Sequence, residues 1–289
     1  MTKKLKILIT VASCAILLIA SVVAVAVNYH KIYVFAETRG WFRQSIGING
    51  TDVVGTSYSF DEIAADPRIT VDQSLMLVNT KHTLPEDYEA DVLEYKDTTV
   101  YMSRCMLESY ARLSAAVSEK TGKKLYVSSD FRTAEEQEEL YREDPLTATL
   151  PGASEHQTGL ALDVYVAKYS GDAFVKSVAG RFVNSHSWEY GFIIRYPSYG
   201  EDVTGIRFEP WHIRYVGHPH ADVIYKNHTT LEEYIWGIEI GDWYEIDGYL
   251  VSRQKPVDGC LILPCEFESC VISPDNTGCY IITVRGGCK

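Results

Sequence analysis

The sequence SEHQTGLALDVYV, Ser154 to Val166, sets a histidine before a glycine and a carboxylate inside an apolar run. Its second half alternates as a half-buried β-strand, with Leu162 and Val164 on one face and Asp163 on the other. A carboxylate among apolar neighbours is costly unless a cation or several hydrogen-bond donors meet it. His156 lies in the turn just upstream and can fold back beside Asp163. A metal or a buried histidine–carboxylate hydrogen bond would each explain this pair.

A second motif, FEPWHIRY, contains Glu209 and His212, three residues apart. Pro210 prevents a regular strand between them, so both side chains can approach the same side. Two imidazole nitrogens and one carboxylate oxygen, with one position left for water, are the ligands of a catalytic zinc. The sequence therefore predicts a zinc centre at His156, Asp163 and His212, with Glu209 free to act as a general base.

Together, the two motifs resemble the VanY-type D-alanyl-D-alanine carboxypeptidases, which are zinc D,D-peptidases of the LAS group, related in fold to the hedgehog signalling domain. The pattern S-x-H-x-x-G-x-A-x-D, from Ser154 to Asp163, and E-P-W-H, from Glu209 to His212, match this family in order and spacing. The resemblance covers residues 84–228, including SSDFRTAEEQ and YGFIIRYP. It implies an α+β fold with a LAS/hedgehog-like zinc peptidase domain.

The resemblance also implies a role for each matching residue. One zinc ion per chain would be held by His156, Asp163 and His212. Glu209 would take a proton from the attacking water and return it to the leaving amine, and Arg132 would bind the substrate carbonyl as negative charge develops. Ser154 and Gln137 match a serine and a glutamine of the family and are candidates for holding the substrate. The sequence departs from the family pattern at Asp130, where glycine is common.

The implied reaction is removal of the terminal D-alanine from peptidoglycan stem peptides ending in D-Ala-D-Ala, which in this family removes the target of vancomycin. Two alternatives stay open. One is a peptidoglycan endopeptidase that uses the same zinc centre. The other is a non-catalytic cell-wall binding module, which would be expected to lack a ligand or the base, whereas this sequence has all four residues.

The N-terminus carries an uncharged apolar run of 21 residues, Ile7 to Val27, after MTKKLK. Such a run is long enough to cross the ~30 Å hydrocarbon core of a bilayer as a helix. The preceding lysines favour a cytoplasmic N-terminus, so we expect a single-pass anchor in the bacterial cell membrane through residues 7–27, with an extracytoplasmic catalytic domain. A cleaved secretory signal is the alternative, because Ala24-Val25-Ala26 resembles a cleavage site.

Composition and patterning indicate four parts of the chain. We expect a cytoplasmic tail and transmembrane anchor at 1–28, an extracytoplasmic spacer at 29–83, the peptidase domain at 84–228 and a small, cysteine-containing, β-rich extension at 229–289. The formal net charge of -12, without a long basic run, argues against nucleic acid as a partner. Six cysteines follow the anchor, and in an exported chain they indicate structural disulfides. They are Cys105, Cys260, Cys265, Cys270, Cys279 and Cys288.

Within the peptidase domain, helical spacing predicts helices over 103–121 and 174–188. The capping box of Thr133 and Glu136 predicts a further helix that begins directly after Arg132. Strands are expected at 124–131, 160–166, 191–196 and 205–216, with a loop at PSYGEDVT. A short helix at LEEYIWGI then leads into the β-rich extension.

Overall fold

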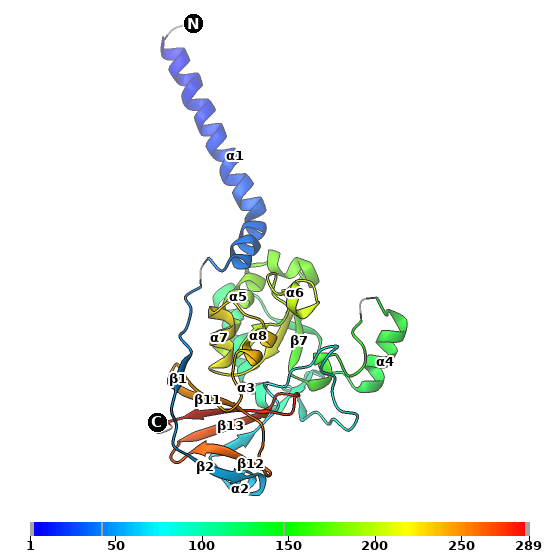
Figure 1. The fold of residues 1–289 in the computed structure, drawn as a ribbon. Helices are drawn as coiled ribbons and strands as arrows, with labels where there is room; N and C mark the ends of the chain where they lie inside the picture. The colour runs from blue at the N-terminus through cyan, green and yellow to red at the C-terminus, as the bar shows by residue number, and fades with distance from the viewer. Residues whose placement is uncertain (1–2, 42, 147, 287–289) are drawn as a thin grey trace. The chain divides into compact units, whose positions relative to one another are not determined.

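The computed structural model describes residues 3–41, 43–146 and 148–286. These fall into two compact units, the second of which begins at Arg43. The first unit consists of helix α1, Lys3–Thr38, whose stretch Thr10–Thr38 is long and apolar enough to cross a membrane (Figure 1). The helix runs beyond the predicted 7–27 because the residues up to Thr38 include no glycine or proline. Gly40, just after it, adopts a positive φ of 61°.

The second unit contains a four-stranded antiparallel sheet in the order β6-β7-β9-β8. Its strands are β6 Tyr126–Ser129, β7 Ala161–Tyr165, β8 Phe192–Ile194 and β9 His212–Tyr215. The helices around it are α3 Leu107–Thr121, α4 Ala134–Glu143, α5 Val178–His186, α6 Glu201–Thr204 and α7 His220–Lys226. Shorter 3-10 segments are η1 Arg104–Met106, η2 Glu155–Thr158, η3 Gly171–Lys176 and η4 Ser187–Tyr190, and β4 Val92–Glu94 pairs with β5 Tyr101–Ser103.

One face of this sheet is apolar and packs against α3 and α5. Leu113 and Val117 of α3 and Val183 of α5 share a buried cluster with Leu162 and Ile213 from the two central strands. Because neighbouring residues of a strand point to opposite faces, Asp163 and His212 project from the other side of the sheet. The mixed fold of helices and antiparallel strands confirms the α+β prediction.

The second unit also contains strands outside this four-stranded sheet, which is called the peptidase sheet below. Its six-stranded sheet has the order β1-β10-β11-β14-β13-β3. β2 pairs separately with β12 (Figure 1). The elements are β1 Asn49–Thr51, β2 Gly55–Ser59, α2 Phe60–Ala65, β3 Ile69–Val71, α8 Leu231–Trp236, β10 Trp243–Ile246, β11 Tyr249–Gln254, β12 Cys260–Pro264, β13 Ser269–Pro274 and β14 Tyr280–Arg285. Three of these strands come from the segment expected to be a spacer, so that segment completes the C-terminal β structure.

Several predicted elements have different bounds in the structure. The expected strand at 205–216 begins only at His212, since Gly205 ends α6 in a left-handed conformation and Pro210 cannot donate to a ladder. The expected loop PSYGEDVT contains α6. The expected helix at 174–188 is divided, because Ser177 caps a new helix by accepting a hydrogen bond from the amide of Gly180.

The expected disulfides are absent among the described cysteines, which are all free thiols: Cys14, Cys105, Cys260, Cys265, Cys270 and Cys279. Strand register explains part of this result. Cys270 lies opposite Val284 and Ile69, and Cys260 lies opposite Ser59, so neither faces another cysteine across the ladder. Cys288 lies outside the described residues.

Candidate metal centre

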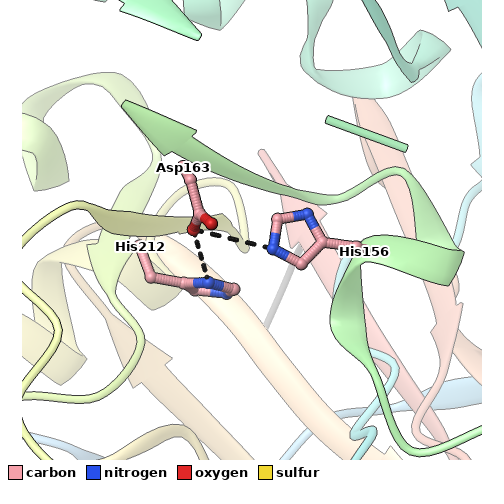
Figure 2. A group of neighbouring side chains, drawn as sticks. All are labelled: His156, Asp163 and His212. Carbon is pink, nitrogen blue, oxygen red and sulfur yellow. Dashed lines mark hydrogen bonds and ion pairs between the residues drawn. The ribbon is translucent and has the colours of Figure 1, made fainter. Parts of the chain in front are cut away.

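The pairing of β7 with β9 builds the centre of the site. Asp163 and His212 are direct partners in this antiparallel ladder, so their side chains project side by side from the same face. His212 Nδ1 lies 3.0 Å from Asp163 Oδ1. Figure 2 marks this contact with a dashed line. The backbone register alone therefore brings together two residues that are 49 positions apart in sequence.

The third member, His156, comes from η2, which ends at Gly159 just before β7. Gly159 has a φ of +70°, a left-handed conformation that turns the chain from η2 into the strand. His156 Nε2 lies 3.6 Å from Asp163 Oδ1, and its Nδ1 is 2.8 Å from the carbonyl oxygen of Asp130. That carbonyl can only accept, so it holds the proton on Nδ1 and leaves Nε2 as a ligand atom.

The three side chains fit a divalent metal. One ligand atom from each of His156, Asp163 and His212 lies within 4.8 Å of the other two, and both histidines are buried. Two imidazole nitrogens and a carboxylate oxygen match the ligand preference of zinc. The structure thus brings together all three residues that the sequence predicted as ligands.

The electrostatics of these residues also suit a metal. Burial lowers the pKa of His156, which favours the neutral form that binds metals. Burial opposes ionisation of Asp163, but the neighbouring imidazoles of His156 and His212 hold its pKa well below the usual range. Burial also opposes protonation of His212, yet Asp163 and Glu155 together raise its pKa to about 9. A metal at His212 therefore has to displace a proton, so its binding strengthens as the pH rises.

Glu209 lies in the turn that precedes β9, where the amide of His212 donates to its carbonyl. Its carboxylate Oε2 is 3.9 Å from His212 Nδ1, so it stands at the edge of the predicted ligand set. Burial raises its pKa, and His212 opposes this shift. A carboxylate whose pKa is moved toward neutrality is well suited to proton transfer.

These groups open into a cleft of about 570 Å³ whose lining includes Arg132, Ser154, Glu209 and Trp211. Arg132 is fixed from behind, because Nη1 donates to Gln137 Oε1 at 2.6 Å and Nη2 donates to Ser129 Oγ at 3.1 Å. Ser154 also lines the cleft, and only 4% of its surface is exposed.

Gln137 occupies a different position from the one expected of a substrate-binding residue. Its side chain is fully buried, and its Nε2 donates to the carbonyl of Thr149 at 2.6 Å while its Oε1 holds Arg132. Both ends of the amide are therefore engaged with the protein. The structure places Gln137 as a support for Arg132 and the following loop.

Sequence reasoning missed the residue that lies directly behind the metal site, Glu155. Its side chain is fully buried, and its Oε2 lies 3.6 Å from His212 Nε2. Its ion-pair partners Arg195 and Arg214 are 40 and 59 positions away, so no local pattern connects them. The available signal was an acidic residue next to a histidine at the start of an otherwise apolar segment.

The comparisons of this chain with known proteins agree on one family. The sequence model of the VanY family, described as D-alanyl-D-alanine carboxypeptidase, matches residues 99–218. The D-alanyl-D-alanine carboxypeptidase of Enterococcus faecium is 29% identical over 259 residues, which cover 81% of this chain and 82% of that protein. The bifunctional D-Ala-D-Ala dipeptidase and D-Ala-D-Ala carboxypeptidase VanXYC of Enterococcus gallinarum is 36% identical over 178 residues, which cover 56% of this chain and 93% of VanXYC.

A solved structure shows the same fold over most of the chain. The vancomycin resistance D,D-dipeptidase VanXYg, in complex with a D-Ala-D-Ala phosphinate analog, aligns with a TM-score of 0.62 at 24% identity. The alignment covers 81% of this chain and 99% of VanXYg. Given the identity to VanXYC over nearly its whole length, the chain belongs to the VanY family of D-alanyl-D-alanine carboxypeptidases and is an enzyme of the carboxypeptidase class.

Proposed function

We propose that this protein is a membrane-anchored, zinc-dependent D-alanyl-D-alanine carboxypeptidase that removes the terminal D-alanine from peptidoglycan stem peptides. The observation that carries the proposal is the convergence of His156, Asp163 and His212 on one point, with Glu209 beside them at the edge of a cleft. The substrate follows from the relatives, whose names specify D-Ala-D-Ala. Removal of the terminal D-alanine would destroy the D-Ala-D-Ala terminus that vancomycin targets, so the enzyme would contribute to vancomycin resistance.

Zinc, when bound, supplies polarisation of the scissile carbonyl and a lowered pKa for an attacking water. The protein's own residues supply the rest of the reaction. Glu209 takes the proton of the attacking water and delivers it to the amine of the departing D-alanine. Its side chain is 22% exposed and lines the cleft, where it can meet a water that attacks the substrate.

Arg132 provides the fixed positive charge of the site. Gln137 and Ser129 hold two of its nitrogens, so the guanidinium lies in the cleft in one orientation. A preorganised cation there stabilises negative charge that develops on the substrate oxygen and also suits the free carboxylate of the stem peptide. Ser154, in the same wall, would contribute hydrogen bonding to the bound peptide.

The same proposal places the enzyme at the cell membrane. The apolar helix α1 includes residues 7–27, which would form the single transmembrane span. The lysines before this span favour a cytoplasmic N-terminus and an extracytoplasmic peptidase domain at 84–228. Anchoring would hold the cleft close to newly exported peptidoglycan precursors.

The test is release of D-alanine by the full-length protein in detergent from a stem peptide ending in D-Ala-D-Ala. We expect release that stops on treatment with a chelator and returns with zinc. Glu209→Gln should abolish release while zinc stays bound, because the general base is lost. Glu201→Gln, at an exposed glutamate on α6, is the matched control and should act as wild type.

Cross-linked muropeptides given to the same preparation distinguish the alternatives. Cleavage of the cross-link without D-alanine release would replace the carboxypeptidase by an endopeptidase at the same centre. Zinc binding without cleavage of either substrate would leave a cell-wall binding module.

A further inference from the structure

A buried cluster of four charged side chains lies behind the metal centre: Glu155, Arg195, Arg214 and Glu232. Burying ion pairs is costly and often contributes little net stability, so stability alone is a poor explanation for the cluster. We propose that Glu155 is the positioning residue for His212: its carboxylate accepts the proton of His212 Nε2 and so directs Nδ1 to the metal. This inference rests on the proposed function, since it concerns the same zinc centre.

The cluster fixes one oxygen of Glu155 and leaves the other available. Arg195 Nε and Arg214 Nη1 both donate to Glu155 Oε1 at 2.6 Å. Arg195 is itself held by two hydrogen bonds to the Glu232 carboxylate, at 2.8 and 2.6 Å. Arg214 Nη2 donates to two backbone carbonyl oxygens at 3.0 and 2.8 Å. With both arginines anchored in this way, the Glu155 carboxylate has one orientation, and its Oε2 points toward His212.

The two atoms that face each other are both buried without a hydrogen-bond partner among the described residues. They are Glu155 Oε2 and His212 Nε2, and 3.6 Å separates them. A buried polar atom that lacks a partner is unfavourable. A small movement would bring the pair into the usual range of about 2.7–3.2 Å for a nitrogen–oxygen hydrogen bond. Each atom is therefore the natural partner of the other.

The proton balance of the imidazole explains what this hydrogen bond would do. A neutral histidine carries one proton, on either Nδ1 or Nε2. His212 directs Nδ1 toward Asp163 at 3.0 Å, so Nδ1 can bind a metal only if the proton is on Nε2. Glu155 Oε2 accepts from that Nε2–H and thus stabilises the tautomer that binds the metal. A carboxylate behind a ligand histidine also raises its basicity.

His156 makes a useful comparison within the same centre. It uses the opposite nitrogens, since its Nδ1 lies against the neutral carbonyl of Asp130 and its Nε2 faces the site. The two ligand histidines are therefore supported by oxygens of different charge. On the nitrogen that faces away from the metal, His212 meets a carboxylate and His156 meets a carbonyl, so loss of the Glu155 carboxylate should weaken the metal site through His212.

The test compares Glu155→Gln with Glu232→Gln in the full-length protein in detergent micelles. Both substitutions remove one negative charge from the same buried cluster, but only the first changes the atom that faces His212. We expect Glu155→Gln to weaken zinc binding about 10- to 100-fold, measured by competition with a chromogenic chelator. Glu232→Gln should lower stability yet keep the zinc affinity near that of wild type. Equal loss of affinity in both variants, or none in Glu155→Gln, would overturn the inference.

A second measurement needs only the wild-type protein and so does not depend on a variant that folds. Nitrogen-15 NMR of histidine-labelled, zinc-bound protein reports which nitrogen of His212 carries the proton. We expect the proton on Nε2, and a proton on Nδ1 would contradict the inference. A wild-type protein that binds no zinc would refute the proposed metal centre itself, whereas zinc bound with unchanged affinity in Glu155→Gln refutes only the role of Glu155.

Discussion

At the scale of single residues, the chemistry of the cleft depends on how side chains are held from behind. Arg132 is the clearest case, because its two terminal nitrogens have different partners, Gln137 and Ser129. Gln137 in turn joins Arg132 to the backbone at Thr149. A planar guanidinium can satisfy two partners and still present positive charge to the cleft, whereas an ammonium is a single point charge.

Arg132→Lys should therefore lower kcat/KM for a peptide ending in D-Ala-D-Ala although it keeps the charge. Loss of one oxyanion donor costs about 10²–10³ in kcat in other hydrolases, and we expect a loss of that order. Arg142→Lys, at an exposed arginine of α4, is the matched control and should have wild-type kinetics. A kcat for Arg132→Lys equal to that of wild type would show that its geometry does not matter.

His220 shows how burial gives a residue a pH-dependent effect on stability. It lies between Tyr234 and Thr283, with hydrogen-bond distances of 2.6 and 2.9 Å to their oxygens. Burial, aided by His218, lowers its pKa to about 3. Between pH 6.5 and 3 the unfolded chain binds a proton at this residue that the folded chain does not. The free energy of unfolding therefore falls as the pH falls through this range.

We expect this residue to contribute a slope of up to about 1.4 kcal/mol per pH unit below pH 6.5. His220→Gln should be less stable at neutral pH, because the hydrogen bonds change, but its stability should fall less steeply toward pH 4.5. Urea unfolding of residues 43–289 at several pH values measures both slopes. Parallel curves for the variant and wild type would show that His220 does not remain neutral in the folded state.

At the scale of secondary-structure elements, the metal centre depends on one turn and one strand pair. The β7–β9 register sets Asp163 beside His212, and the turn at Gly159 brings η2 back so that His156 reaches them.

Sequence patterns predicted helices and strands well where the signal is local. The α4 capping box at Thr133 and the α3 helix that ends before Gly122 both formed as expected. The strand expected from residue 205 begins only at His212, because Gly205 ends α6 in a left-handed conformation and Pro210 cannot donate to a ladder.

The turn gives a prediction with an internal control. Gly159 and Gly122 have nearly the same left-handed backbone, with φ of +70° and +66°, but a Cβ at Gly159 would lie 2.5 Å from Val92 Cγ1 and 3.0 Å from the amide of Ser103. A Cβ at Gly122 would meet nothing within 4 Å. Gly122→Ala should thus lower the free energy of unfolding by the backbone strain alone, about 1 kcal/mol. Gly159→Ala should lower it by about 2–3 kcal/mol and also weaken zinc binding. If urea unfolding gave the two variants similar losses of unfolding free energy, the Val92 side chain would have moved away from the new Cβ at little cost.

At the scale of the whole molecule, the assembly of distant segments was beyond the reach of sequence patterns. The segment at 49–71 was expected to be part of a spacer, yet its strands pair with β10, β12 and β13. Pairing between segments about 200 residues apart leaves no local signal, since hydrogen bonding of a short strand does not depend on which strand is its partner. The metal centre was predictable for the opposite reason, because its residues lie in two short motifs whose chemistry is specific.

The expected extension at 229–289 also shares a core with the peptidase sheet. One buried cluster includes Ile193 of β8 and Val216 after β9 together with Ile235 of α8, Val251 of β11 and Ile281 of β14. Glu232 of α8 also neutralises Arg195, the residue that holds Glu155. Removal of the extension would expose this apolar surface and leave Arg195 without one of its two buried carboxylate partners.

A chain that ends at His228 should therefore fail to form a stable peptidase domain. We expect it to aggregate or bind a hydrophobic dye, to be cleaved rapidly by added protease and to lose D-alanine release. A chain that begins at Arg43 should retain release in solution, because residues from Arg43 onward form their own compact unit. If the chain that ends at His228 were soluble, protease-resistant and active, the extension would be an independent appendage. The cluster around Ile193 and Ile281 would then contribute little, although both side chains are almost completely buried.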